Sequence, residues 1–348
     1  MLAYFILLIL VLFFLVLGKV KGFDYSYAAI FIILTLFAGF RYMVGIDFEQ
    51  YQNIFDYVKS GSLFVTNELG FGLFIKLLDF IGGTAQLFFF SFAALTQYFT
   101  YKAIQKNSLN PGMSILVYFC ILSFYLFSFN GVRQSLAGAI FLYSIYFIQN
   151  SDLKRYSFYV ILASVFAHLS IIFYYPVYFV VKKHYSTFIK LIILFAAIAS
   201  GFIIDKLIAY TPYVSYAGDS KSFDVAIDAK IYAFLLLGIF LEVVRYKFDK
   251  TDFSNVLFNF NFISVLILFM LIFQNNTALI LILKRLHNYI LATYIFLIPL
   301  IFDNLEYKSK KISEYAFYML FIFIYIITII AIGSRIQIIP YHMNFQLF

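Results

Sequence analysis

Apolar runs of about 20 residues recur along this chain from one end to the other. A helix of that length crosses the hydrocarbon core of a bilayer, because all of its main-chain hydrogen bonds are internal. Hydrophobic residues make up 64% of the 348 residues and charged residues only 12%, so no water-soluble fold could cover this chain with polar surface. The sequence therefore predicts an all-α, polytopic integral membrane helical bundle with roughly 10–12 membrane segments.

That many segments leave no room for a separate soluble domain, so residues 1–348 are predicted to form a single transmembrane domain. Two polar stretches, at about 41–70 and 207–229, are expected to be its external loops. The first apolar run is expected to remain as a helix, because Lys19 and Lys21 follow it where a signal peptide would have a cleavage site. The net charge of +8 is spread over short loops, which is typical of a membrane protein and not of a nucleic-acid-binding protein.

Basic turns orient the predicted bundle, because cytoplasmic loops of membrane proteins are enriched in Lys and Arg. Basic residues at 154–155 and at 182–183 would both be cytoplasmic, although a single apolar stretch, residues 157–181, lies between them. One span cannot return to its own side of the membrane. We therefore expect this stretch to fold back near its middle, as two short helices that meet around His168.

A second short segment begins where the polar stretch 41–70 ends. Residues 69–81 number only about 13, too few for a span, and Gly82 and Gly83 separate them from the next apolar run. We expect a short or re-entrant helix here. Together with the break at His168, it predicts two broken segments that open to the same side and line a cavity from the midplane to the outer face.

Residues 41–51, RYMVGIDFEQY, form a polar cluster at the edge of an apolar run. The cluster contains Arg41, two carboxylates including Asp47, and Tyr51. Charged groups in this position are costly unless they face water, protein or a charged ligand. Two interpretations stay open: Arg41 is a topology anchor that reaches the lipid headgroups, or the cluster belongs to a binding site. Apolar residues at helical spacing also predict an amphipathic helix over residues 47–58.

Two further arginines lie at the ends of apolar runs. Arg133 opens a predicted helix, where its charge opposes the helix dipole and is tolerated more easily if an anion binds there too. Arg285 shares a helical face with Tyr289. Arg41, Arg133 and Arg285 are all expected at the outer face, where planar guanidinium groups could together bind a dianion or diphosphate. Taken singly, each could equally be an interfacial anchor.

His168 lies within an apolar run, in the sequence VFAHLS. It could be a structural residue, or it could donate a hydrogen bond or act as a base near neutral pH. The sequence contains no P-loop, no HExxH, no GxSxG and no CxxC pattern, and no pair of histidines has metal-ligand spacing. The single cysteine, Cys120, excludes a disulfide framework. No cofactor and no metal site are therefore expected.

Several short motifs follow one another along the chain. They are R-x-x-x-G-x-D-x-x-x-Y at 41–51, E-x-G-F at 68–71, N-x-x-R-Q-x-x-A at 130–137, F-x-H-x-S at 166–170, R-x-x-x-Y at 285–289 and Pro340-Tyr341. Each motif is unspecific alone, but the ordered set resembles the EpsG family, the Wzy-like polysaccharide polymerases. The resemblance covers about residues 37–341.

The resemblance implies a glycosyltransferase of the bacterial cytoplasmic membrane, multi-pass, with its active site facing the periplasm or exterior. Such enzymes polymerise undecaprenyl-diphosphate-linked oligosaccharide repeat units on the outer face, for O-antigen or exopolysaccharide. The implied partners are the lipid-linked donor and acceptor, membrane lipid and a chain-length regulator, with no nucleic acid. No metal is expected in the reaction, because arginines can stabilise the departing diphosphate.

The resemblance also implies roles for individual residues. The expected diphosphate ligands are Arg133 and Arg285, with support from Arg41. The candidate bases are His168, Asp47 and Glu68, with His168 favoured. The residues expected along the sugar path are Tyr51, Asn130, Gln134, Tyr289 and Tyr341.

Three alternative functions stay open at this point. A flippase or transporter of lipid-linked glycan would also use broken helices, but it would be expected to show internal repeats, which this sequence lacks. An O-antigen ligase-type transferase would share the donor and would favour one much larger external loop. A membrane O-acyltransferase would use a buried histidine but would not need three arginines at one face.

Overall fold

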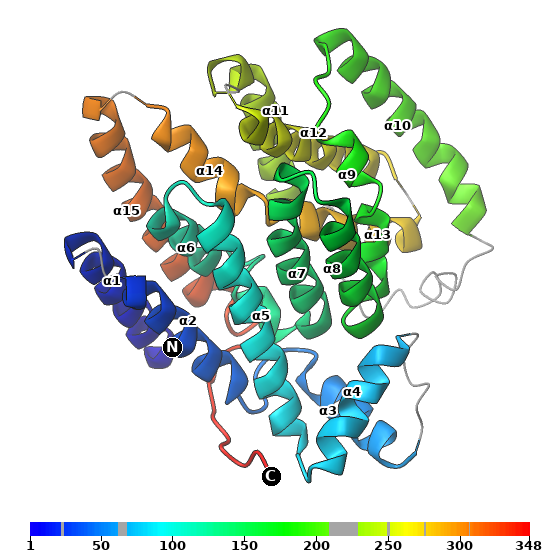
Figure 1. The fold of residues 1–348 in the computed structure, drawn as a ribbon. Coiled ribbons are helices and arrows are strands. Elements are labelled where there is room, and N and C mark those ends of the chain that lie inside the picture. The colour runs from blue at the N-terminus through cyan, green and yellow to red at the C-terminus, as the bar shows by residue number, and fades with distance from the viewer. Residues whose placement is uncertain (22–23, 62–67, 209–228, 249–250, 275, 306) are drawn as a thin grey trace. The chain divides into compact units, whose positions relative to one another are not determined.

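The computed structural model describes the chain except for residues 22–23, 62–67, 209–228, 249–250, 275 and 306. It is 79% helical, and the described part of the chain contains no strand (Figure 1). Within those residues, four segments are long and apolar enough to cross a membrane: 2–19, 252–272, 277–303 and 311–332. Shorter apolar helices cover 25–39, 111–120, 169–180 and 187–201. The prediction of an all-α, multi-pass membrane protein is confirmed, whereas the number of spans stays a prediction.

The chain forms two compact units. Unit 1 comprises residues 1–175 and 298–348, and unit 2 comprises residues 176–297. The single transmembrane domain predicted for residues 1–348 stays a prediction. Of the two expected external loops, 41–70 contains one helix and the start of another, and nearly all of 207–229 lies outside the described residues.

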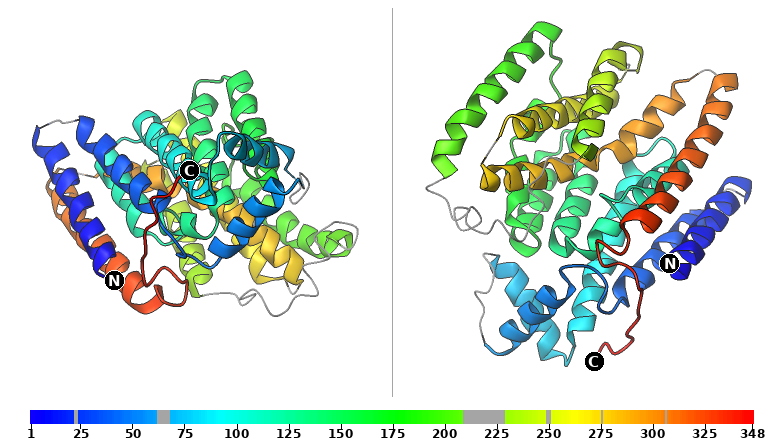
Figure 2. Two further views of the ribbon diagram at one scale, coloured as in Figure 1. Left: turned by 90° about the horizontal axis from the view of Figure 1, so that it is seen from below. Right: turned by 180° about the vertical axis from the view of Figure 1, so that it is seen from behind.

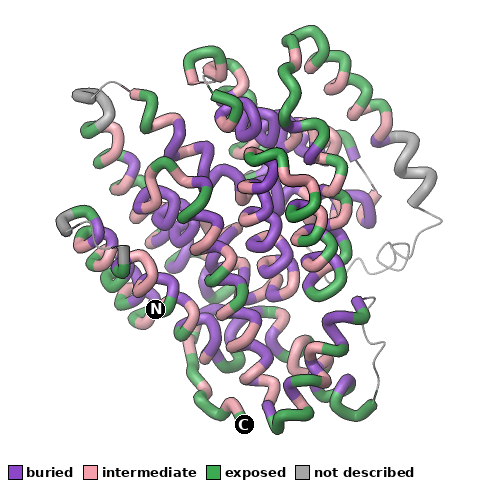
Figure 3. Tube along the Cα trace, in the orientation of Figure 1, coloured by how far each residue is buried: buried purple, intermediate pink, exposed green. Residues whose placement is uncertain are grey.

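Unit 1 is built around two buried helices that pack against each other, α5 (Ala85–Asn107) and α7 (Val132–Gln149). Helix α2 (Asp24–Gly39) packs against α5, and α8 (Leu153–Phe166) packs against α7. Figure 3 shows the burial along α5 and α7. Helix α7 buries apolar residues around most of its circumference, as expected for a helix surrounded by others. The remaining elements of unit 1 are α1 (Leu2–Lys21), α3 (Phe48–Lys59), α4 (Leu69–Phe80), α6 (Pro111–Cys120), η1 (Leu126–Phe129), η2 (Leu169–Tyr174) and α15 (Tyr307–Ile332).

The chain folds back at His168, as predicted. Helix α8 ends at Phe166, and His168 has extended backbone angles of φ −152° and ψ 120° before the 3₁₀ helix η2 begins. The Tyr156 hydroxyl, near the start of α8, donates to the carbonyl of Tyr174, at the end of η2, at 2.6 Å. The segment therefore returns along its own length, with the irregular backbone around His168 at the reversal.

The predicted short helix after the polar stretch 41–70 is α4, with 12 residues. Gly82 follows it with a φ of +80°, a conformation that favours glycine, and the chain then enters α5. Helix α3 confirms the expected amphipathic segment, because it buries Phe48, Phe55 and Val58 on one face. Beyond α15, the C-terminal segment (red) runs past the end of α2 to the start of α5 (Figures 1 and 2).

Unit 2 is built around α12 (Asp252–Ile272), which packs against α10 (Thr187–Ile208), α11 (Ala229–Phe248) and α13 (Thr277–Leu291). A capping box begins α12: the Thr251 hydroxyl accepts from the main-chain N–H of Ser254, whose hydroxyl accepts from Thr251 N–H. The short helix α9 (Val177–Val180) opens the unit, and α14 (Tyr294–Asp303) leads out of it.

Candidate functional site

An enclosed ion pair of unit 1 joins two of the predicted residues, Glu68 and Arg133. The Arg133 Nη2 contacts the Glu68 Oε2, and the two side chains are only 13% and 7% exposed. The second Glu68 oxygen accepts from the main-chain N–H of Leu169 at 3.1 Å. The Arg133 Nε donates to the carbonyl of Ala167 at 3.1 Å, and the guanidinium carbon lies 4.4 Å from the centre of the Phe71 ring. Arg133 is thus held in one orientation by a carboxylate, a carbonyl and an aromatic face.

Local sequence explains how these groups meet. Glu68 is the N-cap residue of α4 and Arg133 is the second residue of α7, so both lie where their helices begin. A Cβ on Gly70 would lie 2.7 Å from the carbonyl oxygen of Val165, so glycine allows α4 to approach the end of α8 closely. Because the helix breaks at residues 167–169, the carbonyl of Ala167 is available to Arg133 and the main-chain N–H of Leu169 is available to Glu68.

His168 lies in the same break, directly between the two main-chain groups that hold the ion pair. Its Nδ1 accepts from the Ser170 main-chain N–H at 3.3 Å and is 2.8 Å from the Ser170 hydroxyl. Since a main-chain N–H can only donate, Nδ1 carries a lone pair, and the neutral imidazole has its proton on Nε2. In this tautomer Nε2 is a hydrogen-bond donor, and the role of His168 as a base stays a prediction.

Arg41 has different surroundings from Arg133. It is 1% exposed, and its Nη1 and Nη2 donate to the carbonyls of Ala38 at 2.6 Å and Phe129 at 3.3 Å. Its guanidinium carbon lies 4.8 Å from the Phe89 ring centre. Burial lowers the pKa of Arg41 to about 10, so it keeps its charge at neutral pH. Arg41 therefore braces main-chain carbonyls, and its buried Nε has no hydrogen-bond partner among the described residues; its role at the diphosphate stays a prediction.

The loop between α2 and α3 contacts the turn that precedes α7. The main-chain N–H of Ile46 donates to Asn130 Oδ1 at 2.6 Å. Gly45 has a φ of +101°, and a Cβ there would lie 2.6 Å from the carbonyl oxygen of Phe129. Asn130 therefore binds the main chain of this loop, and its place along a sugar path stays a prediction.

The remaining predicted residues of unit 1 are spread over this region. Asp47 is the N-cap residue of α3, and Gln134, next to Arg133 in α7, is 8% exposed. Burial raises the pKa of the Tyr51 hydroxyl. The positive charge of Arg133 lowers this pKa, whereas the carboxylate of Asp47 raises it. Tyr341 belongs to the C-terminal segment, where its hydroxyl donates to the carbonyl of Phe37.

Arg285 and Tyr289 belong to α13 in unit 2; Tyr289 is 1% exposed and Arg285 is half-buried. The convergence of three arginines stays a prediction. Across the described residues, no three His, Cys, Asp or Glu side chains gather as a group that could hold a metal ion.

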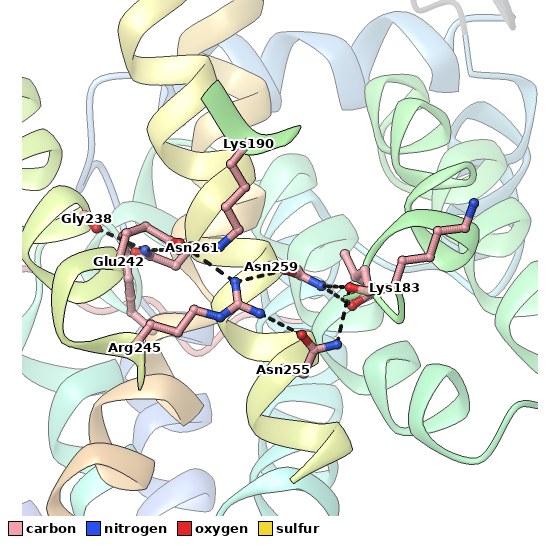
Figure 4. A network of polar contacts seen from close by, with 10 residues as sticks. Lys183, Lys190, Gly238, Glu242, Arg245, Asn255, Asn259 and Asn261 are labelled. Carbon is pink, nitrogen blue, oxygen red and sulfur yellow. Dashed lines mark hydrogen bonds and ion pairs between the residues drawn. The ribbon is translucent and has the colours of Figure 1, made fainter. Parts of the chain in front are cut away.

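A polar network in unit 2 was missed from the sequence (Figure 4). Glu242 on α11 accepts from Lys190 at 2.6 Å and from Asn261 on α12 at 2.8 Å. Arg245, one turn further along α11, donates to Asn255 at 2.6 Å and to Asn259 at 3.0 Å. These two amides donate in turn to the main-chain carbonyls of residues 181–183. The signal was available in Asn255 and Asn259, which are spaced to share a face of α12, and in Asn261, all within an otherwise apolar run.

Comparison with protein families places this geometry in context. The sequence model of the EpsG family matches residues 24–343, which is most of the chain. Neither curated proteins nor solved structures yield a match. The multi-pass helical architecture and the ordered motifs agree with the family match. The chain belongs to the EpsG family, a family of Wzy-like polysaccharide polymerases.

Proposed function

We propose that this protein polymerises oligosaccharide repeat units carried on undecaprenyl diphosphate, at the outer face of the bacterial cytoplasmic membrane. The growing chain moves from its lipid carrier to the non-reducing end of the next lipid-linked unit. Family membership supports the reaction class. The observation that carries the assignment to this site is the oriented, nearly enclosed Arg133 guanidinium next to His168 and a carboxylate.

At the anomeric carbon the reaction makes one bond and breaks one, and the acceptor hydroxyl loses its proton. The acceptor hydroxyl oxygen attacks the anomeric carbon of the donor sugar, and the bond from that carbon to the diphosphate oxygen breaks. Its electron pair leaves with undecaprenyl diphosphate, so negative charge grows on the phosphate oxygens. A guanidinium already fixed in orientation stabilises that charge without having to reorganise.

Glu68 occupies the guanidinium of Arg133 when no diphosphate is bound. Phosphate oxygens accept hydrogen bonds from a guanidinium as carboxylate oxygens do, and a diphosphate carries more negative charge in total than one carboxylate, so diphosphate can take this place. A displaced Glu68 loses its cationic partner and becomes a better proton acceptor. We assign to Glu68 the proton of the acceptor hydroxyl, with Asp47 as the second candidate.

His168 takes the complementary role on this proposal. Its Nδ1 is bound to Ser170, so Nε2 can donate a hydrogen bond to the departing diphosphate. Arg285 keeps its proposed role in diphosphate binding, and Tyr51, Gln134 and Tyr289 keep theirs along the sugar path. Arg41 supports the site through the loop that it braces.

A complementation experiment tests the proposal. The gene is deleted and replaced with the Arg133→Ala variant, and the surface polysaccharide is run on a gel. We expect the ladder of long chains to collapse to single-repeat material, because the leaving group loses its cation. Arg155→Ala is the matched control: its side chain is 70% exposed, pairs with the nearby Asp152 and lies 6.0 Å from the centre of the Phe147 ring, so its ladder should be unchanged.

Two outcomes would contradict the proposal. A full ladder from Arg133→Ala, with the protein present in the membrane at normal amount, would remove Arg133 from the reaction. Absence of any repeat unit at the surface would instead indicate a flippase, because export would have failed before polymerisation.

A further inference from the structure

The C-terminal segment of unit 1 pairs with the loop between α2 and α3 through main-chain hydrogen bonds. The loop, residues 40–46, and residues 337–347, here called the C-terminal strap, run side by side. Their bonds are Gly45 N–H to Gln337 O at 2.8 Å, Tyr42 N–H to His342 O at 2.9 Å and Asn344 N–H to Phe40 O at 2.8 Å, with a bridge between Arg41 and Met343. The strap thus supplies partners for the main chain of a loop that belongs to no helix.

Both ends of the strap are anchored to helices of the same unit. The Tyr4 hydroxyl of α1 donates to the carbonyl of Ile338 at 2.7 Å. At the other end, Thr84 precedes α5; its main-chain N–H donates to the carbonyl of Leu347 at 3.0 Å, and its hydroxyl donates to that of Gln346 at 2.8 Å. A segment held at two ends and in the middle is an ordered part of the fold.

Tyr341 is the central side chain of the strap. Its ring stacks on Phe37, near the end of α2, with centroids 4.0 Å apart and planes at 12°. Its hydroxyl donates to the Phe37 carbonyl at 2.5 Å, and Tyr4 packs edge-on against the ring at 5.6 Å. The ring and the hydroxyl of Tyr341 are therefore both directed to the protein.

The opposite side of the loop contacts the turn that leads to Arg133. Arg41 donates to the carbonyl of Phe129, Gly45 packs on the same carbonyl, and Ile46 donates to Asn130. Helix α7 begins two residues after this turn, at Val132. The loop therefore lies between the strap and the turn, and it can transmit the position of one to the other.

We propose that the C-terminal strap, through Tyr341, is a positioning element that holds the 40–46 loop against the 129–130 turn and so maintains the orientation of Arg133. Tyr341 is a positioning residue in this arrangement and does not line a sugar path. The structural part of the inference stands on these contacts alone, and only its consequence for polymer synthesis rests on the proposed function.

Thiol labelling tests the structural part without any activity. Val44, in the middle of the loop, is 0% exposed, so a Val44→Cys protein in detergent should react slowly with a maleimide. Adding Tyr341→Ala removes the stacked ring and the hydroxyl bond, and we expect the reaction at position 44 to become about tenfold faster or more. Tyr341→Phe keeps the ring and should give a smaller increase, which is the partial rescue expected of a positioning role.

Cys120 supplies an internal control, because it is 0% exposed in α6 and we expect it to react only when its own surroundings open. Mass spectrometry separates labelling at the two positions. Phe348→Ala is the matched control for the strap: Phe348 is 73% exposed, and its removal should leave both rates unchanged.

Each result decides the inference. Faster labelling at position 44 with Cys120 protected supports it, and an unchanged rate in Tyr341→Ala overturns it. If Tyr341→Ala exposes both cysteines, Tyr341→Phe decides: labelling that rises at position 44 alone supports the strap, and no rise refutes it.

The activity arm uses the gel assay. If the strap positions Arg133, Tyr341→Ala shortens the polysaccharide chains and Tyr341→Phe restores most of their length. A full-length ladder from Tyr341→Ala overturns the proposed consequence of the strap for polymer synthesis. If Arg133→Ala also makes full-length chains, it is the proposed function that fails, and the labelling result still stands.

Discussion

The coupling between Glu68 and Arg133 can be measured by a double-mutant cycle with Glu68→Gln and Arg133→Met. Glu68→Gln keeps the size of the side chain and an oxygen for Leu169, but it leaves a cation that is only 13% exposed without its anion. Arg133→Met leaves a carboxylate that is 7% exposed without its cation. Breaking an enclosed pair from one side costs about 3–5 kcal/mol, because the remaining charge is not compensated.

The size of the coupling follows from the burial of the two side chains. Two unit charges at about 4 Å attract by about 1 kcal/mol in water and about 4 kcal/mol at an effective dielectric constant near 20. With side chains that retain slight exposure, we expect a coupling of about 2–3 kcal/mol, so the double variant should be more stable than the sum of the single losses implies. The exposed pair of Arg155 and Asp152 should couple by only about 0.3–0.5 kcal/mol.

Equilibrium unfolding of the purified protein in mixed micelles, with rising SDS and far-UV circular dichroism as the signal, provides the four free energies. The cycle at Arg155 and Asp152 is measured in the same detergent as the control. A Glu68–Arg133 coupling no larger than that of the exposed pair would refute the reasoning, since it would mean that the two charges do not share a low-dielectric contact.

Three further predictions follow from single residues. Gly45→Ala should destabilise the protein by more than about 1 kcal/mol, because the new Cβ meets a carbonyl at 2.6 Å; Gly61→Ala, with φ +115° and open space, should cost less in the same unfolding assay. Asn261→Leu should cost about 2–4 kcal/mol, because the fully buried amide binds Gly238 and Glu242, and a drop in melting temperature checks it. His168→Gln should keep a longer polysaccharide ladder than His168→Ala, since glutamine can donate a hydrogen bond but cannot act as a base; equal loss in both variants would contradict the donor role.

The sequence by itself determined the fold class and the two interruptions of the helices. In a bilayer every main-chain N–H and C=O needs a partner, so an apolar run of sufficient length must be helical whatever surrounds it. The break at His168 was predictable because two basic turns cannot flank a single span, and the structure places a chain reversal there. The short helix α4 was predictable from its length and from the glycines that follow it.

Only the tertiary structure distinguished Arg41 from Arg133, both of which lie in unit 1. Arg41 and Arg133 each follow an apolar run. Arg41 donates hydrogen bonds to main-chain carbonyls, whereas Arg133 forms an ion pair with the carboxylate of Glu68. The strap around Tyr341 likewise joins the end of the chain to α2. A helix is decided by hydrogen bonds within a few residues, whereas the partner of a buried charge is decided by which distant segments pack against it. That choice cannot be read from local sequence.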